Sequence, residues 1–197
     1  FIKLYENMGF PTYVPDDNFE QALIDLGYDD VLDDYVLTAN IYDVTYLNVE
    51  ERGISDLTGI EAFTALETLK LDDNQLTSLD LSSNTALETL NLDENQLTSL
   101  DVSNNPALTY LNCRDNQLTA LDVSNNTALE MLFCHSNQLT SLDVSNNTAL
   151  EYLNCNDNQL TSLDVSNNTA LAVLHVQHNQ LTSLDVSNNM VLADLET

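Results

Sequence analysis

The sequence predicts a repeat solenoid, a stack of similar coils that is mainly β in structure, over most of its 197 residues. Three observations predict this fold class. The sequence repeats every 21 residues from Leu66 onward, and a fixed period of this length is typical of solenoids. Apolar and polar residues alternate within each repeat, which indicates a short strand. Clusters of Asn and Ser between the alternating stretches indicate turns.

The chain divides into an N-terminal linker with a helical cap, residues 1–43, and a solenoid, residues 44–197. The solenoid comprises an opening repeat (44–65), the 21-residue repeats (66–191) and a truncated repeat (192–197). The truncated repeat leaves an apolar edge open, so we expect either that more protein follows Thr197 or that this end forms an end-to-end dimer. The start at Phe1 rather than Met fits the removal of an upstream segment, as in a processed secreted protein.

The segment from Pro15 to Gly27 predicts the helix of the cap. Asp16 or Asp17 can cap its N-terminus, and Gly27 is typical of a helix exit. Three apolar residues at helical spacing are expected to cover the open end of the solenoid core, and they are Phe19, Leu23 and Leu26. Residues 1–11 show no clear pattern and are interpreted as a linker.

Four acidic residues follow this helix, at Asp29, Asp30, Asp33 and Asp34. They lack the order of ligands and Gly that an EF-hand requires. We therefore interpret the segment as a solvated acidic turn rather than a calcium site.

Each complete repeat carries the pattern L-x-x-L-x-[LCV]-x-x-N-x-L, as in the repeat that begins at Leu150. Leu153 and Cys155 are expected to point inward, and positions 152, 154 and 156 outward. This pattern resembles leucine-rich repeats from about Val44 to the end, and its Leu-Asp-Val second half is similar to a 21-residue bacterial subclass, IRREKO. The segment from Val14 to Leu23 resembles the caps of secreted bacterial leucine-rich repeat proteins. The resemblance implies a parallel sheet along one face of the solenoid and an extracellular or cell-surface location.

Two columns of Asn are expected to satisfy buried backbone groups where the chain turns, because an amide side chain both donates and accepts. The first column, which the resemblance identifies as an asparagine ladder, is Asn74, Asn95, Asn116, Asn137, Asn158 and Asn179. The second is Asn84, Asn105, Asn126, Asn147, Asn168 and Asn189. Cys113, Cys134 and Cys155 replace an aliphatic residue of an inward column, so we expect them to act as small buried apolar residues.

The outward positions of the first strand vary between repeats, whereas the exposed positions of the second half stay nearly constant. This contrast is what a binding face on a shared frame would produce, and drift of an unconstrained surface is the alternative. Aromatic residues and Arg are typical of interface hot spots. The predicted ligand-binding face comprises Tyr110, Asn112, Arg114, Met131, Phe133, His135, Tyr152, Asn154, Asn156 and His175.

An Asp column raises a question of charge, because like charges about 4.8 Å apart repel by roughly 0.9 kcal/mol even in bulk water. We expect each carboxylate to accept N–H bonds from the following Ser-Asn turn. Bound Ca²⁺ and raised pKa values are the alternatives. The calcium candidates are Asp101, Asp122, Asp143 and Asp164. A constant Thr column (Thr77, Thr98, Thr119, Thr140, Thr161, Thr182) lacks the second Thr row that an ice-binding face would favour.

Catalysis finds no support in the sequence. No Ser is paired with a His in a known motif, and no Gly-rich phosphate loop occurs. His175 and His178 have the spacing of metal ligands, which leaves zinc as an alternative. A formal net charge of −28 argues against nucleic acid, since binding it requires clustered Lys and Arg. No segment is apolar enough for insertion into a membrane.

We therefore predict a non-catalytic module without a cofactor that binds a protein or peptide outside the cell, with a glycan as second choice. Tyr110 and Tyr152 lie in one column two coils apart, about 10 Å, and could stack on sugar rings. The alternative function is a structural spacer or adhesin stalk without a specific ligand face.

Overall fold

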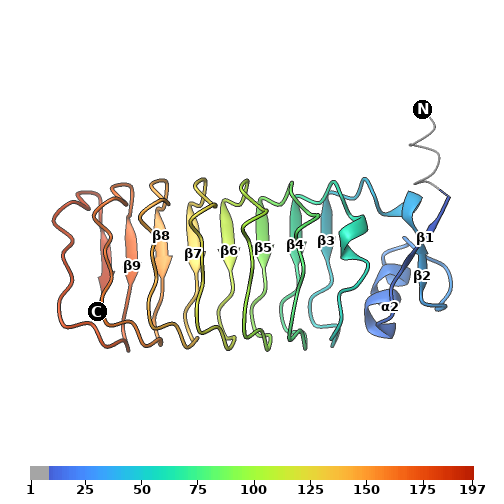
Figure 1. Ribbon diagram of the computed structural model, residues 1–197, viewed down its shortest axis with the longest axis horizontal. Coiled ribbons are helices and arrows are strands. Elements are labelled where there is room, and N and C mark those ends of the chain that lie inside the picture. Colours follow the sequence, from blue (N-terminus) through green and yellow to red (C-terminus); the bar gives the residue numbers. More distant parts are fainter. Residues whose placement is uncertain (1–8) are drawn as a thin grey trace.

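The computed structural model describes residues 9–197 and has the predicted architecture, an elongated solenoid with a helix near its N-terminal end (Figure 1). An eight-stranded parallel sheet follows chain order along the solenoid, with one strand from each coil. Its strands are β3 (Tyr46–Asn48), β4 (Thr68–Lys70), β5 (Thr89–Asn91), β6 (Tyr110–Asn112), β7 (Met131–Phe133), β8 (Tyr152–Asn154), β9 (Val173–His175) and β10 (Asp194–Glu196).

The register of this sheet is the 21-residue period itself. Leu111 pairs with Leu132, Leu132 with Leu153, and Leu153 with Leu174. Residues 21 apart therefore lie side by side, and the central residue of each strand from β3 to β9 is buried. The alternation of apolar and polar residues predicted which side chains point inward, because successive side chains of a strand lie on opposite faces.

The cap contains a small antiparallel sheet that the sequence analysis missed. Strand β1 (Pro11–Tyr13) pairs with β2 (Tyr35–Leu37), and helix α2 (Asp17–Asp25) lies between them in the chain. The interpretation of residues 1–11 as a linker is wrong at Pro11, which begins β1; residues 1–8 lie outside the described range. Two 3-10 turns, η1 (Thr38–Asn40) and η2 (Ile60–Ala62), precede and follow β3.

Asp16 is the N-cap of α2 and also joins the helix to the first coil. Its Oδ1 accepts the backbone N–H groups of Asn18 and Phe19, both at 3.0 Å. Its Oδ2 accepts from the Ser55 N–H, the Ser55 hydroxyl and the Asp56 N–H. Partial burial alone would raise the pKa of this carboxyl, but these hydrogen bonds outweigh it and lower the pKa.

The apolar face of α2 covers the first coil with Phe19, Ala22 and Leu23, which are buried. The prediction that Leu26 would join them is wrong, since Leu26 is 42% exposed. The helix ends at Asp25, and Gly27 then takes a left-handed φ of 82°. This turn brings Tyr28 back against the core in place of Leu26, with the Tyr28 N–H donating to the Leu23 carbonyl.

Six columns of buried apolar residues fill the solenoid, and the three Cys belong to one of them. Cys113, Cys134 and Cys155 are free thiols with no solvent exposure. Burial raises the pKa of Cys113 and of Cys155 to about 12, so these thiols stay protonated and unreactive. They act as small apolar residues, as predicted.

The two Asn columns are buried but differ in their hydrogen bonding. In the first column the amide both donates and accepts: Asn137 Nδ2 donates to the carbonyls of Cys113, Cys134 and His135, and its Oδ1 accepts the Leu118 N–H. In the second column the amide satisfies buried carbonyls as predicted, but it only donates. Asn126 Nδ2 reaches the carbonyls of Val102 and Asn105, while its Oδ1 is buried without a partner.

The Asp column forms the local hydrogen bonds that the sequence predicted. The carboxylate accepts the N–H of the residue two positions on, at 2.9 Å in each case, as from Ser103 to Asp101 and from Ser124 to Asp122. The side-chain hydroxyl and the backbone N–H of the following Ser lower the pKa of the Asp carboxyls despite their neighbours' charges, so the alternative of raised pKa values is wrong.

The far end of the solenoid exposes apolar side chains. Met190 is 87% exposed, and Val191 and Leu195 are also exposed. Leu181 is only partly buried, whereas its equivalents in earlier coils, such as Leu139 and Leu160, are buried. Among residues 9–197, no helix has the length and apolar character needed to cross a membrane.

The difference between the Asn columns gives a first prediction. Replacing Asn137 with Ala leaves one donor and three acceptors without this partner, and should lower the free energy of unfolding by about 2–4 kcal/mol. Asn126→Ala removes only donors and should cost about 1–3 kcal/mol. Urea unfolding measures both, and exposed Asn125→Ala serves as the control. An equal loss in the free energy of unfolding for the variants at positions 126 and 137 would contradict the different hydrogen-bonding roles of the two Asn columns.

The N-cap gives a pH-dependent prediction. Asp16→Ala should lower the free energy of unfolding by about 1–2 kcal/mol at pH 7. Because the folded-state pKa of Asp16 is depressed, this stabilisation is present above the unfolded-state pKa and is lost as pH falls through the folded-state pKa. The gap between the wild type and the variant should therefore close at acid pH in urea titrations. Asp17→Ala, which leaves the cap intact, should show no such closing gap.

Candidate functional site

The outward side of the sheet carries a continuous row of aromatic rings. Tyr110 contacts Phe133 at 5.5 Å between ring centroids, and Phe133 contacts Tyr152 at 4.7 Å. Tyr152 in turn meets His175 edge-on at 5.7 Å. The row zigzags across strands β6 to β9, because its residues alternate between the first and last positions of successive strands. Each ring therefore contacts a diagonal neighbour on the next strand. We call these four residues the aromatic diagonal.

The diagonal gives the detailed arrangement of the two tyrosines. Tyr110 and Tyr152 were expected in one column, two coils apart, within an apolar patch that includes Met131 and Phe133. Phe133 lies between them and packs against both rings. Diagonal neighbours in a sheet are close enough for large rings to meet, and such contacts hold the rings in place. The result is one continuous apolar ridge, with Met131 exposed beside it.

Asn112 was predicted on the ligand-binding face but is only 8% exposed. It lies in register between Asn91 and Phe133, and its Oδ1 accepts the Arg114 N–H at 3.2 Å. A polar side chain at this position is covered once a bulky ring occupies the next strand. Asn112 therefore supports the strand end, and little of it can contact a ligand.

Arg114 marks the boundary between the aromatic ridge and an acidic region. Its Nε donates to Asp93 Oδ1 at 2.5 Å, and its guanidinium lies 3.5 Å from Glu94. On the far side, His135 is partly buried, and burial together with the positive Arg114 lowers its pKa. His135 is therefore a neutral imidazole at neutral pH, and its buried Nδ1 makes no hydrogen bond to the described residues.

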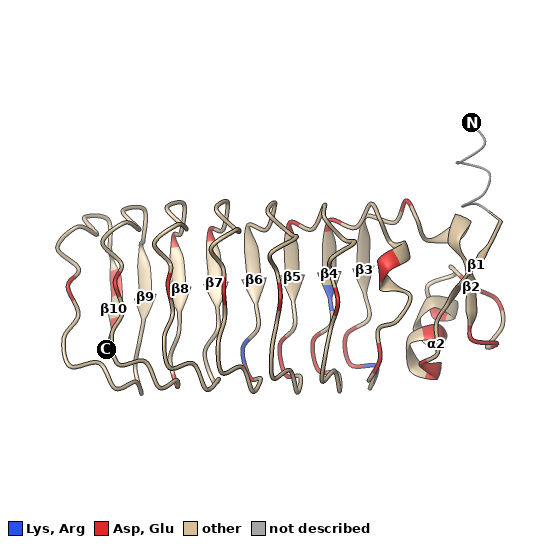
Figure 2. Cartoon of the chain, in the orientation of Figure 1, with Lys and Arg blue, Asp and Glu red and all other residues tan. Residues whose placement is uncertain are grey.

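The acidic region lies at the ends of β3, β4 and β5. A groove of about 240 Å³ is lined there by Glu50, Glu51, Asp72, Asp73, Asp93 and Glu94. Burial, reinforced by the charges of Glu50 and Asp93, raises the pKa of Asp72 to about 6. Figure 2 shows acidic residues at this end of the sheet, with basic residues on β4 and in the segments below β3 and β6.

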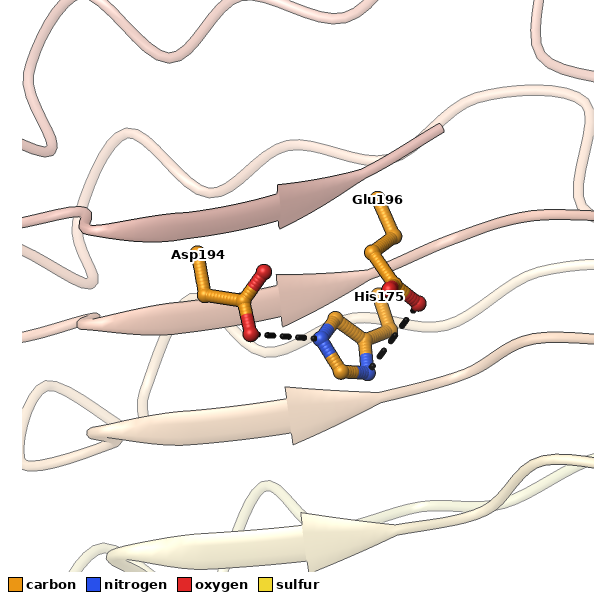
Figure 3. Close-up of side chains that lie close together, drawn as sticks. All are labelled: His175, Asp194 and Glu196. Carbon is orange, nitrogen blue, oxygen red and sulfur yellow. Dashed lines mark ion pairs between the residues drawn. The ribbon is translucent and has the colours of Figure 1, made fainter.

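The remaining predicted residues lie near β8 and β9. Asn156 Oδ1 accepts the Gln177 N–H at 2.7 Å, and Asn154 Oδ1 accepts the Asn156 N–H. His175 lies between the carboxylates of Asp194 and Glu196 from β10 (Figure 3). The sequence analysis missed these two acids because they belong to the truncated repeat.

The two histidines considered as a zinc pair have separate partners. His178 has a left-handed φ of 54° in the turn after β9, and its Nδ1 lies 2.8 Å from Asp157 Oδ1. His175 lies within the strand and faces the two acids of β10. Spacing in the sequence suggested a shared site, but the turn gives the two side chains different surroundings.

Comparisons with known proteins agree with the repeat pattern. The family model "Leucine Rich repeats (2 copies)" matches residues 127–168, and a model of the "LVIVD repeat" matches residues 108–135. The structure places both segments in coils of the same solenoid. Among curated proteins, Internalin J of Listeria monocytogenes is 41% identical over 83 residues, which is 42% of this chain and 9% of that protein. The chain thus spans a small part of the length of this relative.

Solved structures share the fold over a longer part of the chain. A leucine-rich repeat protein of Leptospira interrogans is 28% identical with a TM-score of 0.69, covering 76% of this chain and 41% of that one. Internalin C2 of Listeria monocytogenes is 23% identical with a TM-score of 0.69, covering 94% of this chain and 95% of that one. The repeat motif, the family-model match and the solenoid fold agree, so the chain has the repeat and the fold of leucine-rich repeat proteins and is similar to bacterial members of that class.

Proposed function

We propose that the chain is a non-catalytic binding module whose outward strand face binds a protein or peptide. The observation that carries this proposal is the aromatic diagonal, an apolar ridge on a face whose frame is otherwise constant. Fixed aromatic rings lose little conformational entropy on binding and dominate the energy of many interfaces. A partner placed along the strand ends would contact this ridge and the acidic groove together.

The charge of the face indicates what kind of partner fits. The acidic groove beside β3–β5 includes Asp72, whose pKa is raised by burial and by the charges of Glu50 and Asp93, which Lys70 offsets only in part. A Lys or Arg side chain in the groove would relieve this repulsion. The proposed partner is therefore a segment with basic residues at one end and apolar residues at the other. The net charge of −28 would also speed its association at low salt.

An extracellular or cell-surface location is part of the proposal, supported by the resemblance of the cap segment Val14–Leu23 to caps of secreted bacterial proteins of this class. The stalk function predicts a face without specificity, and the packed rings of the diagonal favour the binding function over it. A glycan is the second choice of ligand, and its sugar rings would stack on the continuous ridge of aromatic side chains.

The ridge gives a direct prediction. Peptides selected from a displayed library on the wild type should contain Lys or Arg near apolar residues. Replacing Tyr110, Phe133 and Tyr152 together with Ser should weaken their binding at least 100-fold, because truncated hot-spot residues cost about 2 kcal/mol or more each. Calorimetric titration measures the affinity. The matched control replaces three exposed residues of the constant column, Thr119, Thr140 and Thr161, with Ala.

Two outcomes would contradict this proposal. If the selected peptides bind the triple Ser variant as tightly as the wild type, the binding surface lies elsewhere. A library that yields no binders would favour the spacer function. Circular dichroism of the triple variant must show the native spectrum for either comparison to count.

The open C-terminal edge gives a separate prediction, an end-to-end dimer. Strand β10 presents one unpaired backbone edge, and Met190 and Leu195 are exposed beside it. Light scattering should show a mass that rises with protein concentration. Met190→Lys with Leu195→Glu should keep the chain monomeric. A wild type that remains monomeric at high concentration would remove the dimer from the proposal.

A further inference from the structure

One group of metal-ligating side chains lies at the end of the aromatic diagonal. His175, Asp194 and Glu196 each offer one ligand atom, and these three atoms lie within 4.8 Å of one another. His175 is the last residue of β9, and the two acids are the first and last residues of β10. Strand register pairs Glu196 with His175 and Asp194 with Val173, so both carboxylates flank one imidazole (Figure 3).

The imidazole of His175 is held in place yet makes no hydrogen bond at Nε2. Its side chain is 15% exposed, and the Tyr152 ring packs against it edge-on. Nε2 lies 3.3 Å from Asp194 Oδ2, but the buried nitrogen has no hydrogen-bond partner among the described residues. Nδ1 lies 3.7 Å from Glu196 Oε2, beyond hydrogen-bond distance. Both contacts bring a carboxylate near a ring nitrogen without forming a good hydrogen bond.

Glu196 also has a partner that orients it. Gln177 Nε2 donates to Glu196 Oε2, while the Gln177 amide oxygen is buried without a partner. A hydrogen bond of this kind to a carboxylate fixes its direction, as the outer shell of a metal site does for its ligands. The two carboxylates are 57% and 49% exposed in their side chains, so they can rotate toward a shared ion.

No basic side chain balances these acids. Within residues 9–197 the Lys and Arg side chains are those of Arg52, Lys70 and Arg114, which all precede β7 in the chain. Arg52 pairs with Asp25, and Arg114 pairs with Asp93. The pair of carboxylates around one imidazole thus lacks a permanent counter-charge at this end of the sheet.

We propose that His175, Asp194 and Glu196 bind a divalent transition metal ion, with Zn²⁺ as the ion that suits this donor set. One imidazole nitrogen and two carboxylate oxygens are ordinary zinc ligands, at about 2.0–2.2 Å. Ligands at those distances in a tetrahedral site stand about 3.4 Å apart, so modest rotation of the exposed carboxylates closes the present spacing. Water completes the coordination. The imidazole favours Zn²⁺ over Ca²⁺, which prefers six to eight oxygen ligands.

The ion would join the last strand to the solenoid. Strand β10 is exposed along its length and is held by backbone hydrogen bonds to β9 and by the Val176 N–H to the Glu196 carbonyl at 2.8 Å. A ligand that binds only the folded arrangement stabilises it by mass action. The proposed ion therefore fixes β10 against β9 at the end of the binding face, and this inference does not depend on the proposed function.

The test is a titration of the metal-free chain with Zn²⁺ in the presence of millimolar Ca²⁺, which occupies sites made of carboxylates alone. Calorimetry should show one tight Zn²⁺ site per chain. Co²⁺ in its place should give the visible absorption of a four-coordinate ion, and Zn²⁺ should remove it. Hydrogen exchange of the β10 amide groups should slow when Zn²⁺ is bound, and the melting temperature should rise.

Variants separate this site from non-specific binding to an acidic protein. His175→Gln, Asp194→Asn and Glu196→Gln should each weaken Zn²⁺ binding at least tenfold and abolish the Co²⁺ absorption. His178→Gln is the matched control, because His178 and Asp157 form a nearby pair outside the cluster. Binding that survives His175→Gln, or that falls equally with His178→Gln, would overturn the proposal. So would a wild type that binds no Zn²⁺ while Ca²⁺ is present.

Discussion

The structure depends on one constraint, which is that no coil can satisfy all of its inward-turning backbone by itself. The carbonyl of Cys113 accepts from Asn116 of its own coil and, at a shorter distance, from Asn137 of the next coil. The carbonyl of Cys134 likewise accepts from Asn137 of its own coil and from Asn158 of the next. The parallel backbone ladder likewise joins each strand only to its neighbours. Since an unpaired buried carbonyl is costly, each coil requires its neighbour to present the same residue at the same place. The 21-residue period in the sequence is the consequence.

This constraint also explains where variation is allowed. Inward positions fill a narrow core, and turn positions must supply particular hydrogen bonds, as Asp101 does for Ser103. The outward strand positions do not fill the core, and only some of them supply a hydrogen bond, as Asn112 does for Arg114, so they can differ from coil to coil at little cost to the frame. A diversified surface on such a frame is what a binding module requires, and a plain spacer would have no physical need of it.

The features predicted from the sequence are those set by residues in one column. Period, strand positions, buried Leu and Cys, and the first Asn column all follow from residues 21 apart. The features that the sequence did not predict depend on contacts between residues of different columns, or lie outside the repeats. The contact of Phe133 with Tyr152 crosses from one column to another, and the burial of Asn112 depends on the size of its neighbour. Periodicity carries no information on either.

Two further misses arise where the chain leaves regular structure. Helical spacing assigned Leu26 to the core, but the left-handed Gly27 ends that spacing and Tyr28 takes the place. The strands of the cap are as short as those of the solenoid, but no repeat in the sequence marks their positions, so β1 and β2 could not be predicted. The acids of β10 appeared only as a remnant of a repeat, although the register places them beside His175.

The outward face changes in chemistry from one end to the other, and this gradient limits how a partner can lie. Acidic side chains dominate beside β3–β5, aromatic rings follow on β6–β8, and an imidazole between two carboxylates ends the row at β9–β10. Neighbouring strands are about 4.8 Å apart, so the gradient extends over roughly 30 Å. A short extended segment could therefore contact the groove and the ridge at once only in one direction. Reversing it would place its basic residues over the rings and its apolar residues among the carboxylates, where burying the acids without a counter-charge is unfavourable. Under the proposed function, the order of chemistry along the sheet would thus specify the orientation of a ligand as well as its composition.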